Sequence, residues 1–146
     1  MKPLRILIVD DHDLMRRGVK TLLQSHAGWE ICGEATNGQE AVELAEELNP
    51  EIIIMDVSMP VLNGLEATRI IHDTHPKTKI LLLTLHSSTE LVRSAFRAGA
   101  RGYVLKSDAE NELMRALNVV VGEGTYISPT IDEVAAKKVI EEIQLH

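Results

Sequence analysis

The chain has 146 residues and a formal charge of −7, and 45% of its residues are hydrophobic while 25% are charged. This length suits one domain with a substantial core, and this composition excludes an intrinsically disordered chain. The acidic excess excludes tight binding of nucleic acid by this stretch alone, because duplex binding depends mainly on Lys and Arg side chains that neutralise phosphates.

The single cysteine, Cys32, excludes an internal disulfide. The chain has neither a signal-peptide pattern nor an apolar run long enough to cross a membrane. We therefore expect a cytoplasmic location and no membrane partner. Only 3% of the residues are aromatic, so the core has to consist mainly of Leu, Ile, Val and Ala.

Five short runs of branched apolar residues predict buried parallel strands, because they lack the polar alternation of half-solvated strands. Segments with helical spacing of apolar residues lie between these runs. Strict alternation of strands and helices favours a doubly wound α/β fold, with a parallel sheet and helices on both faces. The predicted strands are Leu4–Val9, Glu30–Ala35, Ile52–Met55, Ile80–Leu85 and Gly102–Leu105.

An extra helix is predicted near the end of the chain. Gly122-Glu-Gly124 forms a break, and Ser128-Pro129 offers an N-cap followed by proline at the first helical position. We therefore divide the chain into a domain at residues 1–124 and a linker or extra helix at residues 125–146. This helix either packs on its own domain or serves as a linker or dimer helix. Its predicted apolar stripe consists of Ile131, Val134, Ala135, Val139 and Ile143.

Polar residues gather at the predicted carboxyl ends of the strands, where open α/β sheets bind ligands. The first strand ends in Asp10 and Asp11, the third in Asp56, the fourth in Thr84 and the fifth in Lys106. A carboxylate cluster needs a cation, and oxygen ligands suit Mg²⁺. Singly, each residue is explained as a helix cap or a surface charge. Together they favour a site in which Asp56 attacks a phosphoryl group, Lys106 pairs with it and Thr84 donates a hydrogen bond.

Several stretches, covering the chain to about Ser128, resemble the signature of bacterial response-regulator receiver domains. They are Ile6-Leu-Ile-Val-Asp-Asp-His12, Met55-Asp56-Val-Ser-Met-Pro60, Asn63-Gly64, Leu83-Thr84 and Tyr103-Val-Leu-Lys106. Further details resemble the NarL/FixJ-type branch of this family: Gly64-Leu-Glu-Ala-Thr68, Ala98-Gly-Ala100 and Tyr126-Ile-Ser-Pro129. The resemblance implies a flavodoxin-like sheet of five parallel strands in the order 2-1-3-4-5.

The resemblance also implies that Asp56 is the phospho-acceptor and that Mg²⁺ is the cofactor. Asp11, Asp56 and the backbone carbonyl of Ser58 would bind the metal, and Asp10 would help through a metal-bound water.

The remaining implied roles concern the phosphoryl group and the response to it. Lys106 would pair with the phosphoryl group, and the backbone N–H groups of Val57 and Leu85 would complete its oxygen cage. Thr84 would turn its hydroxyl toward the group, and Tyr103 would be the aromatic switch that changes rotamer in concert.

A sensor histidine kinase is the partner that the resemblance implies, with the domain catalysing its own modification. The phosphorylated domain would dimerise through the fourth helix and fifth strand, or through the first and fifth helices. Members of this branch normally continue into a helix-turn-helix DNA-binding domain. We therefore expect a fragment of a transcription regulator that binds DNA when complete, with a stand-alone receiver that acts by protein contacts as the alternative.

Two other classes of protein share parts of this pattern. A phosphohydrolase with an aspartyl-phosphate intermediate would need a second acid–base carboxylate and a cap over its substrate, and neither is evident. A flavodoxin-like nucleotide or flavin site is compatible with the fold, but the chain lacks G-x-G-x-x-G and a Gly-rich first loop. His12, His86 and the other histidines show no paired metal-ligand spacing, so zinc is not expected.

Overall fold

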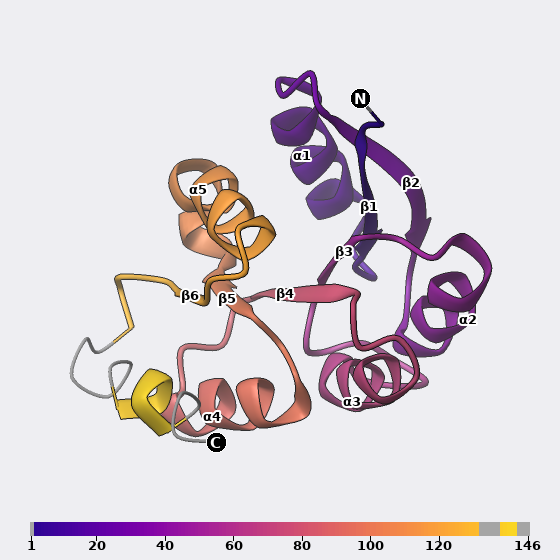
Figure 1. The fold of residues 1–146 in the computed structure, drawn as a ribbon. Coiled ribbons are helices and arrows are strands. Elements are labelled where there is room, and N and C mark those ends of the chain that lie inside the picture. Colours follow the sequence, from indigo (N-terminus) through magenta and orange to yellow (C-terminus); the bar gives the residue numbers. More distant parts are fainter. Residues whose placement is uncertain (1, 132–137, 143–146) are drawn as a thin grey trace.

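The computed structural model describes residues 2–131 and 138–142, and one parallel sheet forms their centre (Figure 1). The strand order is β2-β1-β3-β4-β5-β6. The predicted doubly wound α/β fold and the order of its first five strands are confirmed, and a short sixth strand extends the sheet beyond β5. The strands are β1 (Leu4–Val9), β2 (Trp29–Ala35), β3 (Ile52–Met55), β4 (Lys79–Thr84), β5 (Gly102–Leu105) and β6 (Tyr126–Ile127).

Helices α1 and α5 cover one face of the sheet, and α2, α3 and α4 cover the other (Figure 1). Three helices begin after capping residues, because the side chains of Asn37, Asn63 and Ser88 each accept a hydrogen bond from the backbone N–H three residues later. The helices are α1 (Asp13–Gln24), α2 (Gly38–Leu48), α3 (Gly64–Thr74), α4 (Thr89–Ala98) and α5 (Ala109–Val121).

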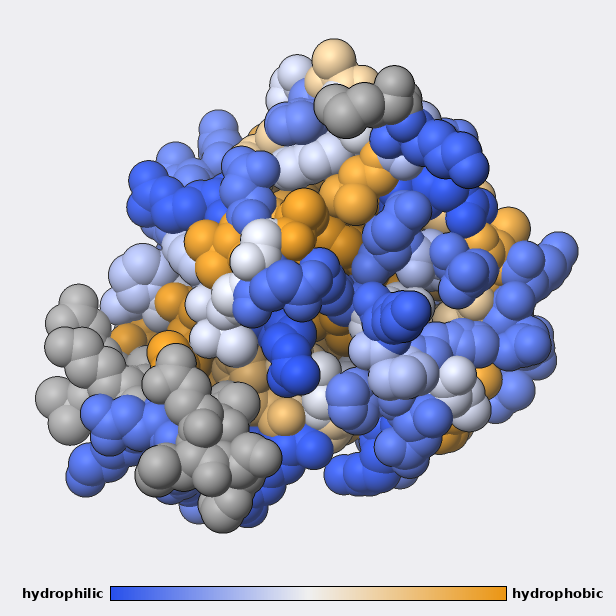
Figure 2. All heavy atoms as spheres, viewed as in Figure 1, coloured by the Kyte–Doolittle hydropathy of each residue, from blue (hydrophilic) through white to orange (hydrophobic). Residues whose placement is uncertain are grey.

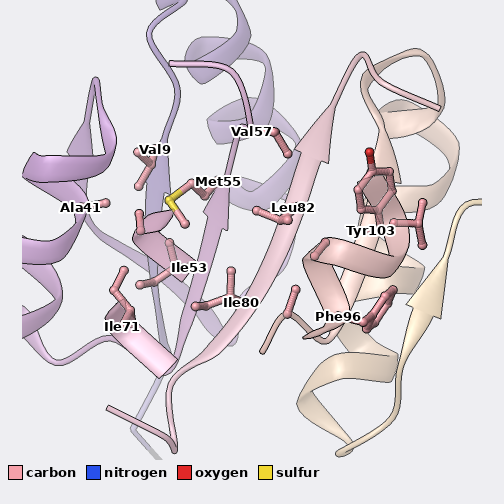
Figure 3. Close-up of a cluster of buried hydrophobic side chains, with 14 of the residues drawn as sticks. Val9, Ala41, Ile53, Met55, Val57, Ile71, Ile80, Leu82, Phe96 and Tyr103 are labelled. Atoms are coloured by element: carbon pink, nitrogen blue, oxygen red, sulfur yellow. The ribbon is translucent and has the colours of Figure 1, made fainter. Parts of the chain in front are cut away.

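The sheet divides the core into two clusters, because alternate residues of each buried strand point to opposite faces. Ile6 and Ile8 of β1 belong to the cluster beneath α1 and α5, which we call the α1/α5 core. Leu7 and Val9 belong to the cluster beneath α2, α3 and α4, which we call the α2–α4 core. The fully buried members of the α1/α5 core are all aliphatic, whereas the α2–α4 core also contains the ring of Tyr103 (Figure 3).

The extra helix was predicted to begin directly after Ser128, but residues 129–131 are not helical. Residues 129–131 form a turn, and residues 138–142 are helical. The reason is that Ser128 is buried and its hydroxyl is used elsewhere: Oγ accepts the Leu105 N–H at 3.1 Å and donates to Asp108 Oδ2 at 3.0 Å. Tertiary hydrogen bonds therefore outweigh the local capping signal.

The predicted apolar stripe is only partly within the described residues. Ile131 and Val139 are buried in the α2–α4 core. Val134, Ala135 and Ile143 lie outside the described residues. The division of the chain after residue 124 stays a prediction.

Hydrophilic residues cover most of the face in Figure 2, and hydrophobic residues show near its centre, in the region of α1 and α5. A groove of about 400 Å³ runs between these two helices, and its lining includes Met15, Gly18, Leu22 and Ala109. Within the described residues, no helix is both long and apolar enough to cross a membrane.

Candidate functional site

Parallel pairing brings the predicted strand-end residues to one edge of the sheet. Strands β1 and β3 end level with each other, so the residues that follow them, Asp10 and Asp56, are neighbours. Both residues are only 4% exposed. Lys106 follows β5, and Thr84, which is fully buried, ends β4. Asp11 lies beside this group and is more exposed. The expected convergence of charges is therefore present.

Lys106 lies between the two buried carboxylates. Its Nζ is 2.8 Å from Asp10 Oδ2 and 3.0 Å from Asp56 Oδ2. Burial opposes its charge, but the hydrogen bonds to Asp10 and Asp56 outweigh burial and raise the pKa of the Lys106 ammonium. The other oxygen of Asp56, Oδ1, accepts the N–H of Val57 at 2.7 Å. One oxygen of Asp56 thus faces a cation, and the other accepts a backbone N–H.

His12 joins the acidic residues, although no paired ligand spacing in the sequence indicates it. Its Nδ1 lies 3.0 Å from Asp10 Oδ1 and 3.2 Å from Asp11 Oδ1. One ligand atom each from Asp10, Asp11, His12 and Asp56 lie within 4.8 Å of one another. This donor set, rich in carboxylate oxygens, fits a hard divalent cation such as Mg²⁺. The signal available in the sequence was the position of His12 directly after the two strand-end aspartates.

A chain of hydrogen bonds connects the edge of the site to the α2–α4 core. Thr84 Oγ1 accepts the N–H of His86 at 3.3 Å, and the His86 ring lies 2.7 Å from Ser58 Oγ. The Tyr103 hydroxyl donates to the His86 carbonyl oxygen at 2.7 Å. Burial, and secondarily the charge of Asp56, raise the pKa of the Tyr103 hydroxyl, so it remains a donor. The backbone of His86 is the link in this chain, through its N–H and its carbonyl oxygen.

The loop after β3 packs closely against the site. A Cβ on Gly64 would lie 2.0 Å from the carbonyl oxygen of Asp56, so only glycine fits there. Of the predicted phosphate-cage residues, Val57 donates to Asp56, and the Leu85 side chain is 73% exposed. The predicted roles of the Leu85 N–H and the Ser58 carbonyl stay predictions.

A model of the response regulator receiver domain family matches residues 6–118. The chain belongs to this family, as the receiver domain of a two-component response regulator. Among curated relatives, "Transcriptional regulatory protein DegU" of Brevibacillus brevis is 40% identical over 128 residues, which are 88% of this chain and 54% of the relative. "Response regulator GacA" of Pseudomonas viridiflava is 38% identical over 135 residues, or 92% of this chain and 63% of the relative. The chain therefore spans less than two thirds of either relative.

Solved structures agree with the family and its branch. A two-component response regulator of the LuxR family from Aurantimonas sp. SI85-9A1 is 34% identical to this chain. The two structures superpose with a TM-score of 0.86, over 99% of this chain and all of that one. The receiver domain of the putative response regulator NarL from Mycobacterium tuberculosis is 28% identical, with a TM-score of 0.79, covering 84% of this chain and 98% of that one. The predicted resemblance to the NarL/FixJ-type branch is confirmed.

Proposed function

We propose that this receiver domain accepts a phosphoryl group on Asp56 from a sensor histidine kinase and then changes conformation to control an output. The observation that carries the proposal is the buried Asp56 carboxylate, which lies against the Lys106 ammonium beside Asp10 and Asp11. A buried carboxylate with an adjacent cation and further acidic residues is the arrangement that aspartyl phosphorylation requires.

In the proposed reaction, an oxygen of Asp56 attacks the phosphorus of a phosphohistidine. The new O–P bond forms as the P–N bond breaks, and the imidazole leaves on the kinase. Lys106 shifts from the Asp56 carboxylate to the phosphoryl oxygens, and the Val57 and Leu85 N–H groups donate to them. Asp11, Asp56 and the Ser58 carbonyl would hold Mg²⁺, with Asp10 assisting through a water, and the ion would offset the charge of the phosphoryl group.

The response would pass through the hydrogen bonds that already connect the site to Tyr103. When Thr84 turns its hydroxyl toward the phosphoryl group, Oγ1 leaves the N–H of His86. The backbone of His86 then shifts, and Tyr103 loses its partner, because its hydroxyl is bound to the His86 carbonyl. The new charge thus biases the packing of α4 on β5.

The output and partners follow from the same proposal. Homodimerisation on phosphorylation would use α4 and β5, or the hydrophobic groove between α1 and α5. The printed names of the relatives, "Transcriptional regulatory protein" and "Response regulator", support control of transcription by a full-length protein that binds DNA. The domain would act in the cytoplasm, as a switch that modifies itself and not as an enzyme with a separate substrate.

Incubation with acetyl phosphate and Mg²⁺, followed by intact mass spectrometry, tests the proposal. We expect one added phosphate on the wild-type protein and on the Asp73→Asn control, because Asp73 is an exposed residue of α3. We expect none on Asp56→Asn. Phosphate on the Asp56→Asn protein, or its absence from the wild type, would contradict the assignment.

A further inference from the structure

His12 occupies a helix N-cap position but does not cap the helix. It precedes α1 in an extended conformation, and its side chain makes no capping hydrogen bond. Capping positions favour Ser, Thr, Asp or Asn, whose short oxygens reach the first-turn N–H groups. The imidazole instead turns back toward the strand end, where Nδ1 faces Asp10 and Asp11.

The spacing of these atoms suits ligands of one ion. On an octahedral ion with bonds of about 2.1 Å, two ligands at right angles lie about 3 Å apart. Nδ1 of His12 lies 3.2 Å from Asp11 Oδ1, and Asp56 also offers an oxygen within the 4.8 Å group. The same spacing describes a hydrogen bond from Nδ1, so the decisive experiment has to detect the metal–nitrogen bond itself.

The contacts of Asp10 allow this change of partner. Asp10 Oδ1 accepts the backbone N–H of His12 at 2.9 Å in addition to its contact with the ring, and Oδ2 binds Lys106. If Nδ1 turns to a cation, Asp10 keeps both of these other partners. The His12 side chain is 61% exposed and is therefore free to make the small rotation.

We propose that His12 binds the divalent cation of the acidic site through Nδ1, together with Asp11 and Asp56, and shifts the preference of the site from Mg²⁺ toward Mn²⁺. Mg²⁺ strongly prefers oxygen ligands, whereas later divalent ions accept imidazole more readily and bind a given nitrogen-containing site more tightly. The inference rests on the proposed function for the position of the ion, and it adds a ligand and an ion preference that the acidic residues alone do not supply.

Electron spin-echo envelope modulation of the Mn²⁺-loaded protein tests this bond directly. We expect modulation from a bound ¹⁴N nucleus in the wild-type protein and its loss in His12→Asn and His12→Gln. The control is His26→Asn, whose ring stacks on Trp29 away from the acidic residues, and it should keep the signal. Titration calorimetry measures the affinity for each ion. We expect the ratio of the Mn²⁺ affinity to the Mg²⁺ affinity to fall about tenfold in both His12 variants, mainly because Mn²⁺ binds more weakly.

Each outcome decides the proposal. A ¹⁴N signal that persists without His12, a wild-type protein that binds Mn²⁺ without such a signal, or an unchanged Mn²⁺/Mg²⁺ ratio overturns the ligand role of His12. If acetyl phosphate with Mg²⁺ still modifies Asp56 in that case, the proposed function stands while this inference fails. A wild-type protein that binds neither ion contradicts both.

Discussion

The two faces of the sheet differ in what they bury. Under α1 and α5, every fully buried member of the core is aliphatic, including Leu113 and Leu117. Under α2, α3 and α4, the core includes Tyr103 (Figure 3), whose hydroxyl lies at the end of the hydrogen-bond chain that begins at Thr84. An aliphatic cluster contains no polar group whose hydrogen bond a new charge could change. A buried hydroxyl, in contrast, can lose its hydrogen-bond partner. The difference suggests that α1 and α5 form the fixed face and α4 the responsive one.

The end of the described chain lies on the responsive face. Helical residues 138–142 lie beside α4 (Figure 1), and Arg93 of α4 pairs with Glu142 at 3.3 Å. Val139 is only 1% exposed and belongs to the same cluster as Tyr103. A change at Tyr103 would therefore reach this segment through packing.

The largest effect is expected from a cavity on the fixed face. Leu117→Ala removes a fully buried side chain from the α1/α5 core and should lower the free energy of unfolding by about 3 kcal/mol. Urea unfolding at equilibrium measures this value. The extent of phosphorylation by acetyl phosphate should stay unchanged where the variant is folded. A loss below about 1 kcal/mol would show that this face is loosely packed.

A matched pair of tyrosine variants compares the two faces. Tyr103→Phe removes the hydrogen bond to the His86 carbonyl, and Tyr126→Phe removes the hydrogen bond to Glu112 of α5. Each should lower the free energy of unfolding by about 1 kcal/mol, the usual contribution of one hydrogen bond. Only Tyr103→Phe should alter the rate of phosphorylation by acetyl phosphate in a time course. Equal rate changes in both variants would remove the distinction between the faces.

Alkaline pH should lower the free energy of unfolding, because the same two tyrosines have raised pKa values in the folded protein. Burial raises the pKa of Tyr103, and burial with a hydrogen bond to Glu112 raises the pKa of Tyr126 to about 12, whereas a tyrosine in an unfolded chain ionises near pH 10. The unfolded state therefore loses these protons first, and the stabilisation, complete below about pH 10, is lost as pH rises toward the folded pKa. In urea unfolding between pH 8 and 11, the midpoint concentration of urea should fall as pH rises. This slope of the midpoint against pH should be smaller for Tyr103→Phe. An equal slope would argue against the burial of this hydroxyl.

The smallest effect is expected from the surface pair on α4. Arg93→Ala removes the ion pair with Glu142, both of whose side chains are partly exposed, and should cost about 0.5 kcal/mol or less at low salt. The loss should disappear in 1 M NaCl, because the screening length of salt falls to about 3 Å at this concentration and exposed charges then hardly interact. Arg69→Ala, which removes an exposed pair with Glu66 within α3, is the control. A larger loss for Arg93→Ala would indicate that residues 138–142 depend on this contact.

The sequence predicted where the strand-end side chains converge, because parallel strands place their carboxyl ends at one edge of the sheet. Apolar runs in the sequence predict the strands, and the ends of these strands give the positions of Asp10, Asp56 and Lys106. The role of His86 and the approach of His12 depend on loop conformations, which local patterns do not encode.

The end of the chain was predicted less well, for a related reason. Strand β6 is only two residues long, so its alternation is too short to recognise, and it exists because β5 offers a free edge. The turn in place of a helix at residues 129–131 follows from the buried contacts of Ser128 with Leu105 and Asp108. Such tertiary contacts override an N-cap signal.

Amide hydrogen exchange, followed by mass spectrometry with and without acetyl phosphate and Mg²⁺, measures whether a phosphoryl group on Asp56 acts on the face beneath α4. We predict altered exchange in α4, β5 and residues 126–131, little change in α1 and the buried part of α5, and no change in Asp56→Asn. Equal changes on both faces, or the same changes in Asp56→Asn, would contradict this account.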